Sequence, residues 1–419
     1  MREMFLFLRN LKGNAKSSVL TEPLWGIPAN LFMPFATLYM FHLGVLDAQI
    51  GLLLAIGRFV QMFMALLGGV ITDKFGRRLT TAIGDFIAWS IPSLIWAFSQ
   101  NFWWFLAAVL VNSAWQITGI SWECLWVDDN AEDGGKIGQI FNWIYICGLL
   151  AVFFAPIAGF FVARYSLVPV VRVLYLFAFV SMTAKLVLLY IFSTETKRGL
   201  ERMEQTKNTS LVRLLFGYVD VFKQMIRSKI MIRALAIQAL VGVTLLISGT
   251  FFALYATQNL GLPEPVLAYL PILRAVVMLS FLFFIQNRLN VFKEHYVMLF
   301  GAVLFVSAHV LLVALPPSSW GLLAVYTFIE ACAGALLLPR MDSLAANAIE
   351  PQERARIRSL FNVVILAVSS PFAFLAGLLS DMDRRLPFLL NIGIFALVII
   401  IVYMGRRFKP LAAREGSHG

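Results

Sequence analysis

The chain alternates between long apolar runs and short polar segments. A helix that crosses a bilayer needs about 20 mostly apolar residues. Cutting the sequence at clusters of charged residues, proline, glycine and asparagine leaves twelve such runs. The pattern predicts an all-α integral membrane protein with twelve transmembrane helices, at residues 20–42, 48–72, 79–99, 102–127, 137–163, 169–193, 229–257, 265–287, 295–315, 319–345, 356–380 and 386–405.

The longest polar segment follows the sixth span and divides the chain into two halves of six spans. We therefore predict a six-helix bundle at residues 20–193, a cytoplasmic linker at 194–228 and a second six-helix bundle at 229–405. Residues 1–19 begin with a basic amphipathic stretch that lacks a cleavage site, so we expect a cytoplasmic lead-in and not a signal peptide. Residues 406–419 are expected to form a cytoplasmic tail.

The two halves resemble each other, as in many transporters that are built from repeats. A constant shift of 216 residues places Arg58 of the second span on Arg274 of the eighth. Farther along, Asn142 matches Asn362 at a shift of 220. Apolar matches are common in so hydrophobic a sequence, but matched intramembrane arginines are not. The repeat predicts two pseudo-symmetric bundles.

Composition places these runs in a lipid environment. Of the 419 residues, 60% are apolar and 14% are charged, whereas soluble proteins carry roughly 25% charged residues. A soluble enzyme, a disordered chain and a coiled coil are thereby excluded. The three Cys and four His are scattered without metal-ligand spacing, so we expect neither a metal site nor a cofactor.

The distribution of basic residues predicts the orientation. The formal net charge is +11, and of the 34 Lys and Arg only Arg164, Arg172, Arg384 and Arg385 fall in the predicted outer loops. Basic residues concentrate on the cytoplasmic side of membrane proteins. We therefore expect both termini in the cytoplasm, a location in the cell membrane and no nucleic-acid partner.

A polar loop between the second and third spans carries a recognisable motif. It reads Gly69-Val70-Ile71-Thr72-Asp73-Lys74-Phe75-Gly76-Arg77-Arg78. This resembles the signature loop of the major facilitator superfamily, Gly-x-x-x-Asp-Arg/Lys-x-Gly-Arg/Lys-Arg/Lys, at every defined position. The corresponding loop of the second half, residues 286–294, keeps only Arg288 and Lys293.

The resemblance implies a secondary transporter in which two six-helix bundles rock around a central site. In that family, the signature Asp and Arg belong to a charge network that stabilises the outward-open state. By analogy, Asp73, Arg77 and Asp128 at the end of the fourth span are gate residues, supported by Gly69, Gly76 and Arg78.

The fifth span leaves the direction of transport open. Cys147, Ala151, Ala155-Pro156 and Gly159 keep the small-residue spacing of the family's antiporter motif, but three glycines are replaced. Close helix packing explains the same spacing. The fourth-span arginine of drug–proton antiporters is also missing, because Asn112 lies near its place.

Two intramembrane arginines are the main candidates for substrate binding. Arg58 lies 11 residues after Asp47, about 16 Å from the outer flank, and Arg274 lies at the same depth. A guanidinium offers a fork of donors that matches carboxylate, phosphate or sulfate oxygens. Nitrate porters of the superfamily likewise set one Arg on each of these two helices, although this chain lacks their glycine-rich signature. The alternative is that each Arg pairs with an acid or with carbonyls of its own bundle.

Other polar residues within the spans complete the candidate site. Charged groups in a membrane are costly, so each is a functional hypothesis. Glu123, Asp342 and Glu330 are candidates for proton coupling, although Asp342 could instead balance the charge of Arg340. For Lys185 we expect a structural salt bridge. Aromatic and amide side chains on the predicted cavity helices add possible substrate contacts, namely Trp115, Asn142, Tyr145 and Asn362.

The sequence thus predicts a monomeric transporter that moves a small organic anion, coupled to protons or by exchange. A drug or cation exporter of the same fold is the alternative, and a non-transporting membrane receptor is a remote one. An intramembrane enzyme is not expected, because no Ser, Cys or His has a partner at useful spacing.

Overall fold

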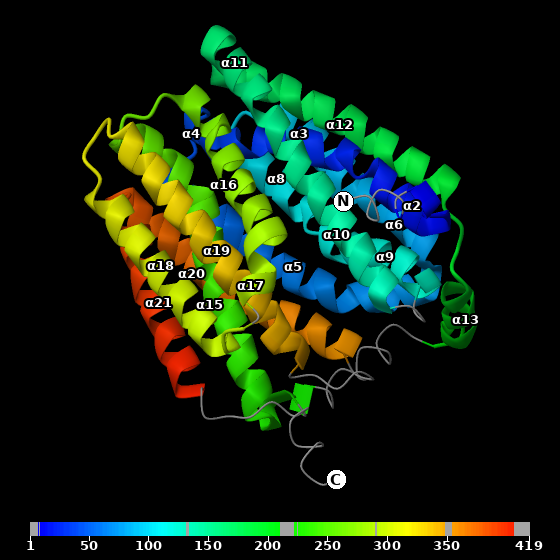
Figure 1. Cartoon of the computed structure of the whole chain (residues 1–419). Helices are drawn as coiled ribbons and strands as arrows, with labels where there is room; N and C mark the ends of the chain where they lie inside the picture. Colours follow the sequence, from blue (N-terminus) through cyan, green and yellow to red (C-terminus); the bar gives the residue numbers. More distant parts are fainter. Residues whose placement is uncertain are drawn as a thin grey trace. The chain divides into compact units, whose positions relative to one another are not determined.

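The computed structural model describes residues 7, 9–130, 134–209, 222–223, 225–289, 291–347 and 354–405. Every regular element among them is helical (Figure 1). Twelve helical segments are long and apolar enough to cross a membrane, at Gly13–His42, Asp47–Phe75, Arg77–Ala97, Phe102–Asn130, Lys136–Tyr165, Leu167–Phe192, Lys229–Asn259, Glu264–Ile285, Glu294–Ala314, Trp320–Ala345, Ile357–Met382 and Leu386–Met404. The predicted all-α class with twelve spans is confirmed.

The chain divides into two compact units. Unit 1 consists of residues 1–44 and 60–217, and unit 2 of residues 45–59 and 218–419. The boundary near residue 217 lies within the predicted linker. Residues 45–59 come long before this boundary in the sequence, but they belong to unit 2. The first half of the second span therefore belongs to unit 2 and its second half to unit 1.

Unit 1 contains the first six spans, except for the first half of α5. Its elements are α2 (Gly13–Thr21), α3 (Pro23–Phe32), η1 (Met33–Phe35), α4 (Ala36–His42), the second half of α5 (Asp47–Phe75), α6 (Arg77–Asp85), η2 (Phe86–Ser90), α7 (Ile91–Ala97), α8 (Phe102–Asn112), α9 (Trp115–Val127), η3 (Asp128–Asn130), α10 (Gly134–Ala151), η4 (Val152–Phe154), α11 (Ala155–Tyr165), α12 (Leu167–Phe192) and α13 (Lys197–Thr206).

Unit 2 contains the last six spans together with the first half of α5. Its other elements are α15 (Lys229–Leu254), η5 (Tyr255–Asn259), η6 (Glu264–Ala268), α16 (Leu270–Ser280), η7 (Phe281–Ile285), α17 (Gln286–Leu289), α18 (Glu294–Ala314), α19 (Trp320–Asn347), α20 (Arg354–Met382) and α21 (Leu386–Met404).

The first helix begins earlier than the apolar pattern indicates. α2 starts at Gly13, although the sequence suggested a span from residue 20. Leu11, Ala15 and Val19 are buried in one cluster with Trp126 of α9 and with residues of α10. The spacing of four residues places the three side chains on one helix face. Packing against neighbouring helices therefore extends the first span into a segment of modest hydropathy.

Several spans contain a local change of helix type. Met33–Phe35 is a short 3-10 turn that contains Pro34. Val152–Phe154 is a second 3-10 turn, which ends two residues before Pro156. A proline inside a helix removes one backbone hydrogen bond, which favours such a break. Pro28, Pro339 and Pro371, by contrast, lie inside continuous helices. Only some prolines within the described spans are thus accompanied by a break in the helix.

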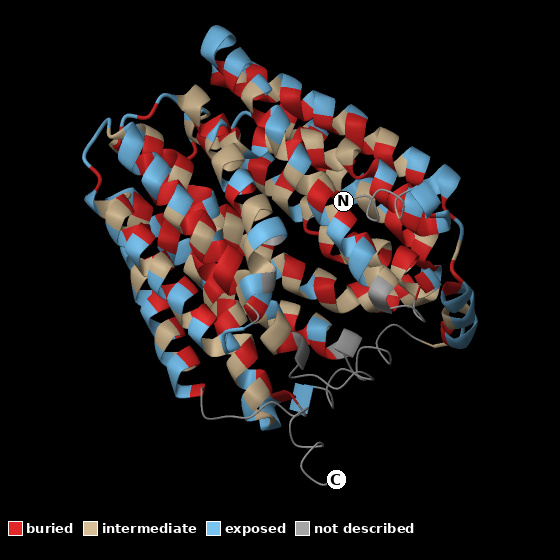
Figure 2. Ribbon diagram, viewed as in Figure 1, coloured by how far each residue is buried: buried red, intermediate tan, exposed pale blue. Residues whose placement is uncertain are grey.

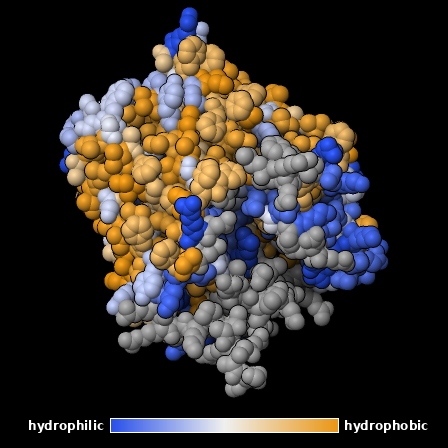
Figure 3. Space-filling model, in the orientation of Figure 1, coloured by the Kyte–Doolittle hydropathy of each residue, from blue (hydrophilic) through white to orange (hydrophobic). Residues whose placement is uncertain are grey.

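The core of unit 2 is formed by α15, α18, α19 and α21. Phe305 of α18 stacks on Phe395 of α21 with ring centroids 4.5 Å apart, and both side chains are almost fully buried. Figure 2 shows the buried positions along the inner sides of these helices. The outer positions carry large apolar side chains such as Phe300 and Leu397, and hydrophobic residues dominate the face drawn in Figure 3. Such a surface suits a lipid environment.

Candidate functional site

The predicted signature loop forms a tight turn between α5 and α6. α5 ends at Phe75, Gly76 has a φ of 82° and α6 begins at Arg77. This backbone conformation favours glycine, since other residues pay a steric penalty there. A Cβ atom at Gly76 would lie 2.6 Å from Oε2 of Glu195. The turn therefore requires glycine both for its backbone angle and for its close neighbour.

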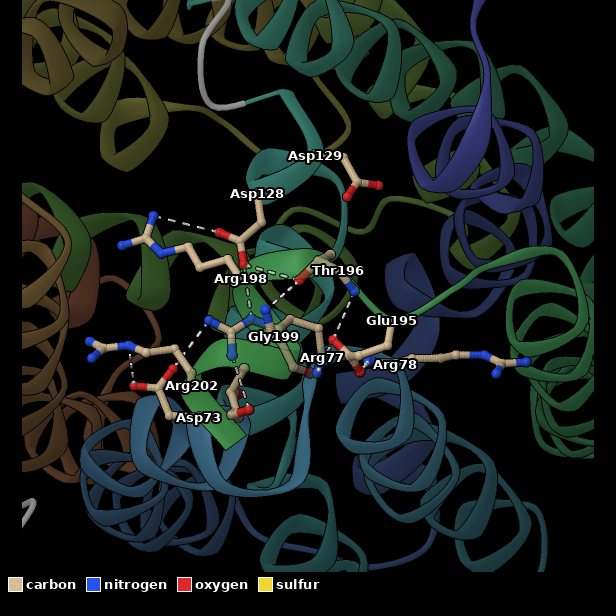
Figure 4. Close-up of polar contacts among 12 residues, drawn as sticks. Asp73, Arg77, Arg78, Asp128, Asp129, Glu195, Thr196, Arg198, Gly199 and Arg202 are labelled. Atoms are coloured by element: carbon tan, nitrogen blue, oxygen red, sulfur yellow. Dashed lines mark hydrogen bonds and ion pairs between the residues drawn. The ribbon is translucent and has the colours of Figure 1, made fainter. Parts of the chain in front are cut away.

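Arg77 lies between the two predicted gate carboxylates. Its Nη2 lies 3.1 Å from Oδ1 of Asp73, and its Nε donates to Oδ2 of Asp128 at 2.9 Å. The Arg77 residue is only 3% exposed, and the side chain of Asp128 is 5% exposed, whereas that of Asp73 is 28% exposed. The contact with Asp128 is therefore the better shielded of the two. Figure 4 shows the arginine between the carboxylates. The structure thus brings together three residues that the resemblance singled out.

Arg78 of the signature loop contacts α12, and Gly68, which directly precedes the loop, lies close to α9. The guanidinium of Arg78 donates to the backbone carbonyl of Tyr190 on α12 at 2.7 and 3.1 Å and lies 4.0 Å from the centre of the Tyr190 ring. Gly69 follows Gly68, where a Cβ atom would lie 2.7 Å from Ile120 of α9. The loop is therefore attached to α9 and α12.

Glu195 contributes to this site, and the sequence analysis missed it. Its carboxylate accepts hydrogen bonds from the backbone N–H groups of Arg77 at 3.1 Å and of Arg78 at 2.9 Å. The first N–H groups of a helix lack partners within the helix, and a negative charge there is favoured by the helix dipole. Glu195 thus caps α6 from a position 118 residues away. The available signal was an acid that directly follows the sixth span.

The start of the predicted linker packs onto the same loop. Thr196 caps α13 by accepting a hydrogen bond from the N–H of Gly199 at 2.9 Å. α13 then places Arg202 3.6 Å from Asp73 and Arg198 3.8 Å from Asp128. Each gate carboxylate therefore faces two arginines (Figure 4). Residues 195–206 join the signature loop in one charge network within unit 1.

In unit 2, the intramembrane Arg274 is paired with an acid. Its Nη2 contacts Oε2 of Glu330, which joins α16 to α19. The side chain of Glu330 is 7% exposed, whereas that of Arg274 is 50% exposed. The contact is the own-bundle pairing that the sequence analysis left open. It uses only part of the guanidinium, which has five N–H donors.

The remaining substrate-binding candidates are spread over both units. Arg58 is half-buried on α5. Like Arg274 and Asn362, it belongs to unit 2. On α10, Asn142 and Tyr145 are both exposed, and their spacing of three residues places them on one face of the helix. Trp115 is partly buried at the start of α9.

The proton-coupling candidates have different surroundings. Glu330 is paired with Arg274, as described above. Asp342 accepts a hydrogen bond from Gln238 of α15 at 3.3 Å. Glu123 is half-buried on α9 and makes no hydrogen bond or ion pair with the residues that the structure describes. Arg340 donates to the Leu336 carbonyl of its own helix and forms no ion pair with Asp342 among the described residues, so the suggested charge balance stays a prediction. Side chains two residues apart on a helix do not face each other.

Two further ion pairs involve acids that the sequence analysis did not single out as intramembrane partners. Lys185 of α12 lies 3.1 Å from Glu22, and both residues are buried.

At the start of α5, Asp47 accepts hydrogen bonds from Ser380 at 2.7 Å and from the Nε of Arg384 at 2.9 Å. All three residues belong to unit 2.

Close helix contact accompanies the Asp47 pair. A Cβ atom added to Gly51 of α5 would lie 2.6 Å from Cα of Gly377 on α20, and one added to Gly377 would lie 2.7 Å from Cα of Gly51. One turn further along α5, the hydroxyl of Ser370 donates to the carbonyl of Ala55 at 2.9 Å. The first half of α5 therefore packs backbone to backbone against α20.

Comparisons with known proteins agree with this architecture. Solved structures with the same fold include the nucleoside transporter NupG (TM-score 0.72, 17% identity, 94% of this chain and 100% of that chain). Another is the human organic anion transporter MFSD10 (TM-score 0.67, 15% identity, 93% and 98%). The xylose transporter XylE from E. coli is a third (TM-score 0.68, 13% identity, 96% and 98%).

Sequence comparison identifies the family. A search of curated proteins finds no match. A family model described as MFS_1 like family matches residues 29–389, which is most of the chain. Together with the twelve spans and the transporter fold, this match shows that the chain belongs to the MFS_1 like family of the major facilitator superfamily, a family of membrane transporters and not of enzymes.

Proposed function

We propose that the protein is a secondary active transporter of a small organic anion, coupled to protons, that works by alternating access. The observation that carries this proposal is the pair of Arg274 and Glu330 inside the membrane-spanning part of unit 2. The fold serves transporters of nucleosides, sugars and organic anions alike. The substrate class is therefore argued from the site and not from the fold.

The difference in exposure between the two partners suggests how anion and proton are linked. Glu330 is buried and needs either a cationic partner or a proton, since a lone carboxylate is costly there. The half-exposed guanidinium of Arg274 has donors left for a planar anion. An anion that takes Arg274 competes with Glu330, which then binds a proton. One negative charge and one proton would thus enter the site together.

The other candidates complete this proposal. Arg58, at the repeat-matched position, is proposed as the second anion-binding group. Trp115, Asn142, Tyr145 and Asn362 are proposed to contact the organic part of the substrate, since aromatic and amide groups suit such contacts. Glu123 and Asp342 are the further candidates for proton coupling.

The signature-loop network is proposed as the gate. The carboxylates of Asp73 and Asp128 already face arginines of the protein itself, namely Arg77, Arg198 and Arg202, and Arg78 is bound to Tyr190, so this network needs no ligand. Gly69 and Gly76 permit the close helix approach and the turn. Such a network acts by favouring one conformational state over another. From the basic inner loops we propose that both termini lie in the cytoplasm and that the protein is located in the cell membrane. We also propose that it is a monomer.

The experiment is a binding and transport assay on the purified full-length protein. A set of organic anions and cations is screened by thermal shift, and the best ligand is then tested with three variants. Arg274→Lys keeps the charge but loses the planar fork, so we expect binding to weaken by roughly ten-fold or more. Glu330→Gln removes the competitor, so we expect tighter anion binding and loss of proton-driven uptake.

The matched control is Arg233→Lys in the same unit. Arg233 donates to the carbonyls of Gly405 and Val402 and so caps α21. This variant should lower stability slightly and leave affinity unchanged. Anion binding that is insensitive to Arg274→Lys would refute the proposal.

A cation exporter is a second candidate, favoured by Glu123. This carboxylate lies half-buried on a membrane-spanning helix without a hydrogen-bonding or ionic partner among the described residues. An organic cation could supply the missing charge. In the same screen, this function predicts stabilisation by cations that Glu123→Gln abolishes and Arg274→Lys does not affect.

A further inference from the structure

A second group of charged residues lies inside unit 1 and does not include the gate carboxylates Asp73 and Asp128. Lys185 of α12 binds Glu22 at the junction of α2 and α3, at 3.1 Å. Its ammonium also lies 5.3 Å from the ring centre of Trp122 on α9. Asp85, at the end of α6, accepts a hydrogen bond from the hydroxyl of Thr118 on α9. All of these residues lie within the membrane-spanning helices.

The helices that carry these groups pack against one another. α12 contacts α2, α3 and α6, and α6 contacts α9. Asp85 forms no ion pair with the residues that the structure describes, and its hydrogen-bond partner there is Thr118. The ammonium of Lys185 is the cation of this cluster, and its direct contact is with Glu22. If both acids were ionised, the cluster would carry one uncompensated negative charge.

An uncompensated charge is costly within a membrane-spanning bundle. Arg78 lines the same narrow gap as Asp85, but it lies seven residues earlier on α6, or about 10 Å along the helix. Its guanidinium is bound to the carbonyl and the ring of Tyr190 and so does not reach Asp85. The neutral hydroxyl of Thr118 cannot cancel a charge. A proton on Asp85 would make the cluster neutral.

Asp85 lines a narrow gap inside unit 1 together with Arg78, Thr81, Leu125, Tyr190 and Ser193, among others. The gap is too narrow for water in this conformation. Arg78 and Tyr190, which line it, contact each other.

We propose that Asp85 is a proton-binding site of unit 1 that carries its proton while Lys185 is bonded to Glu22. Release requires that the contact between Arg78 and Tyr190 loosens and water enters the gap. The O–H bond of the carboxyl group then breaks, the proton passes to that water, and the carboxylate keeps the electron pair. Thr118 and Lys185 then stabilise the carboxylate. This site uses other residues than Arg274 and Glu330, and it does not depend on the charge of the substrate.

The same chemical change at the two carboxylates tests the assignment. Asp85→Asn replaces a neutral acid with a neutral amide of the same shape, so the melting temperature of the purified protein should stay close to that of the wild type. Glu22→Gln removes the charged partner of Lys185, so the melting temperature should fall by several degrees. A fall of equal size in both variants, or a larger fall for Asp85→Asn, would overturn the proposal.

Infrared spectroscopy of the full-length protein gives a direct readout that needs no substrate. We expect a carbonyl stretch of a protonated carboxylic acid at neutral pH, which shifts in D2O. The band should vanish in Asp85→Asn and persist in Glu330→Gln. Thr118→Val should move the band to higher frequency without removing it, because one hydrogen bond to the carbonyl is lost. An unchanged band in Asp85→Asn would refute the site, whether or not the anion assay succeeds.

Discussion

The carboxylate of Asp47 and the guanidinium of Arg384 lie 337 positions apart in the sequence and form a two-point ion pair. Nε of Arg384 donates to Oδ2 at 2.9 Å and Nη2 donates to Oδ1 at 3.3 Å. Asp47 is 2% exposed. The pair joins the start of the second span to the segment that follows the eleventh, so it closes one end of α5 against α20.

Asp47→Asn tests the strength of this contact. The amide keeps one acceptor oxygen but loses the charge, and a hydrogen bond to a charged group contributes about 1.5 to 3 kcal/mol. We expect a ten-fold or larger shift towards conformations in which α5 and α20 are apart. Distances between spin labels on the two helices measure this shift. An unchanged distance distribution would contradict the expectation.

Gly51→Ala tests the backbone contact. Its Cβ atom would lie 2.6 Å from Cα of Gly377, so the helices must separate and transport should fall strongly. Gly249→Ala in α15 is the matched control, because a Cβ atom there meets nothing within 4 Å. Alanine favours a helix by about 1 kcal/mol over glycine, so the control should be at least as stable as the wild type. Equal transport by both variants would argue against the close contact.

Glu195→Ala tests the cap on α6. Loss of a helix cap costs about 0.5 to 2 kcal/mol, and the amides of Arg77 and Arg78 lose their acceptor. We expect faster hydrogen exchange at these two amides, with little change in α15 as the internal reference. Glu195→Gln should give an intermediate effect, since one oxygen remains. Unchanged exchange in the alanine variant would show that water caps the helix equally well.

Asp73→Asn tests the gate. Arg77 keeps its contact with Asp128, so the fold should persist, whereas the balance between conformations should change. We expect slower transport in vesicles and substrate affinity within a few-fold of the wild type. Transport at the wild-type rate would refute a gating role for Asp73.

Lys185→Met tests the buried pair in unit 1. Removing one partner leaves Glu22 uncompensated, and such losses cost about 3 to 5 kcal/mol. The double variant Glu22→Gln/Lys185→Met removes both charges and should recover much of the stability. Thermal unfolding of the single and double variants measures the coupling. Additive losses would mean that the two side chains do not stabilise each other.

The sequence by itself determined the architecture of this protein. Twelve apolar runs separated by charged loops leave a helix as the main option for each run, because backbone groups must be satisfied within the span. The signature loop identified Asp73, Gly76 and Arg77 because their spacing is local.

Tertiary structure alone decided which charges meet. Glu195 lies 118 residues from the amides that it caps, and Asp47 lies 337 residues from Arg384. Such pairs leave no periodic signal. Arg274 could have faced a ligand or an acid, and only the packing of α16 against α19 placed Glu330 beside it. Apolar patterning fixes where helices lie along the chain, whereas the side-chain packing between helices fixes which polar groups compensate one another.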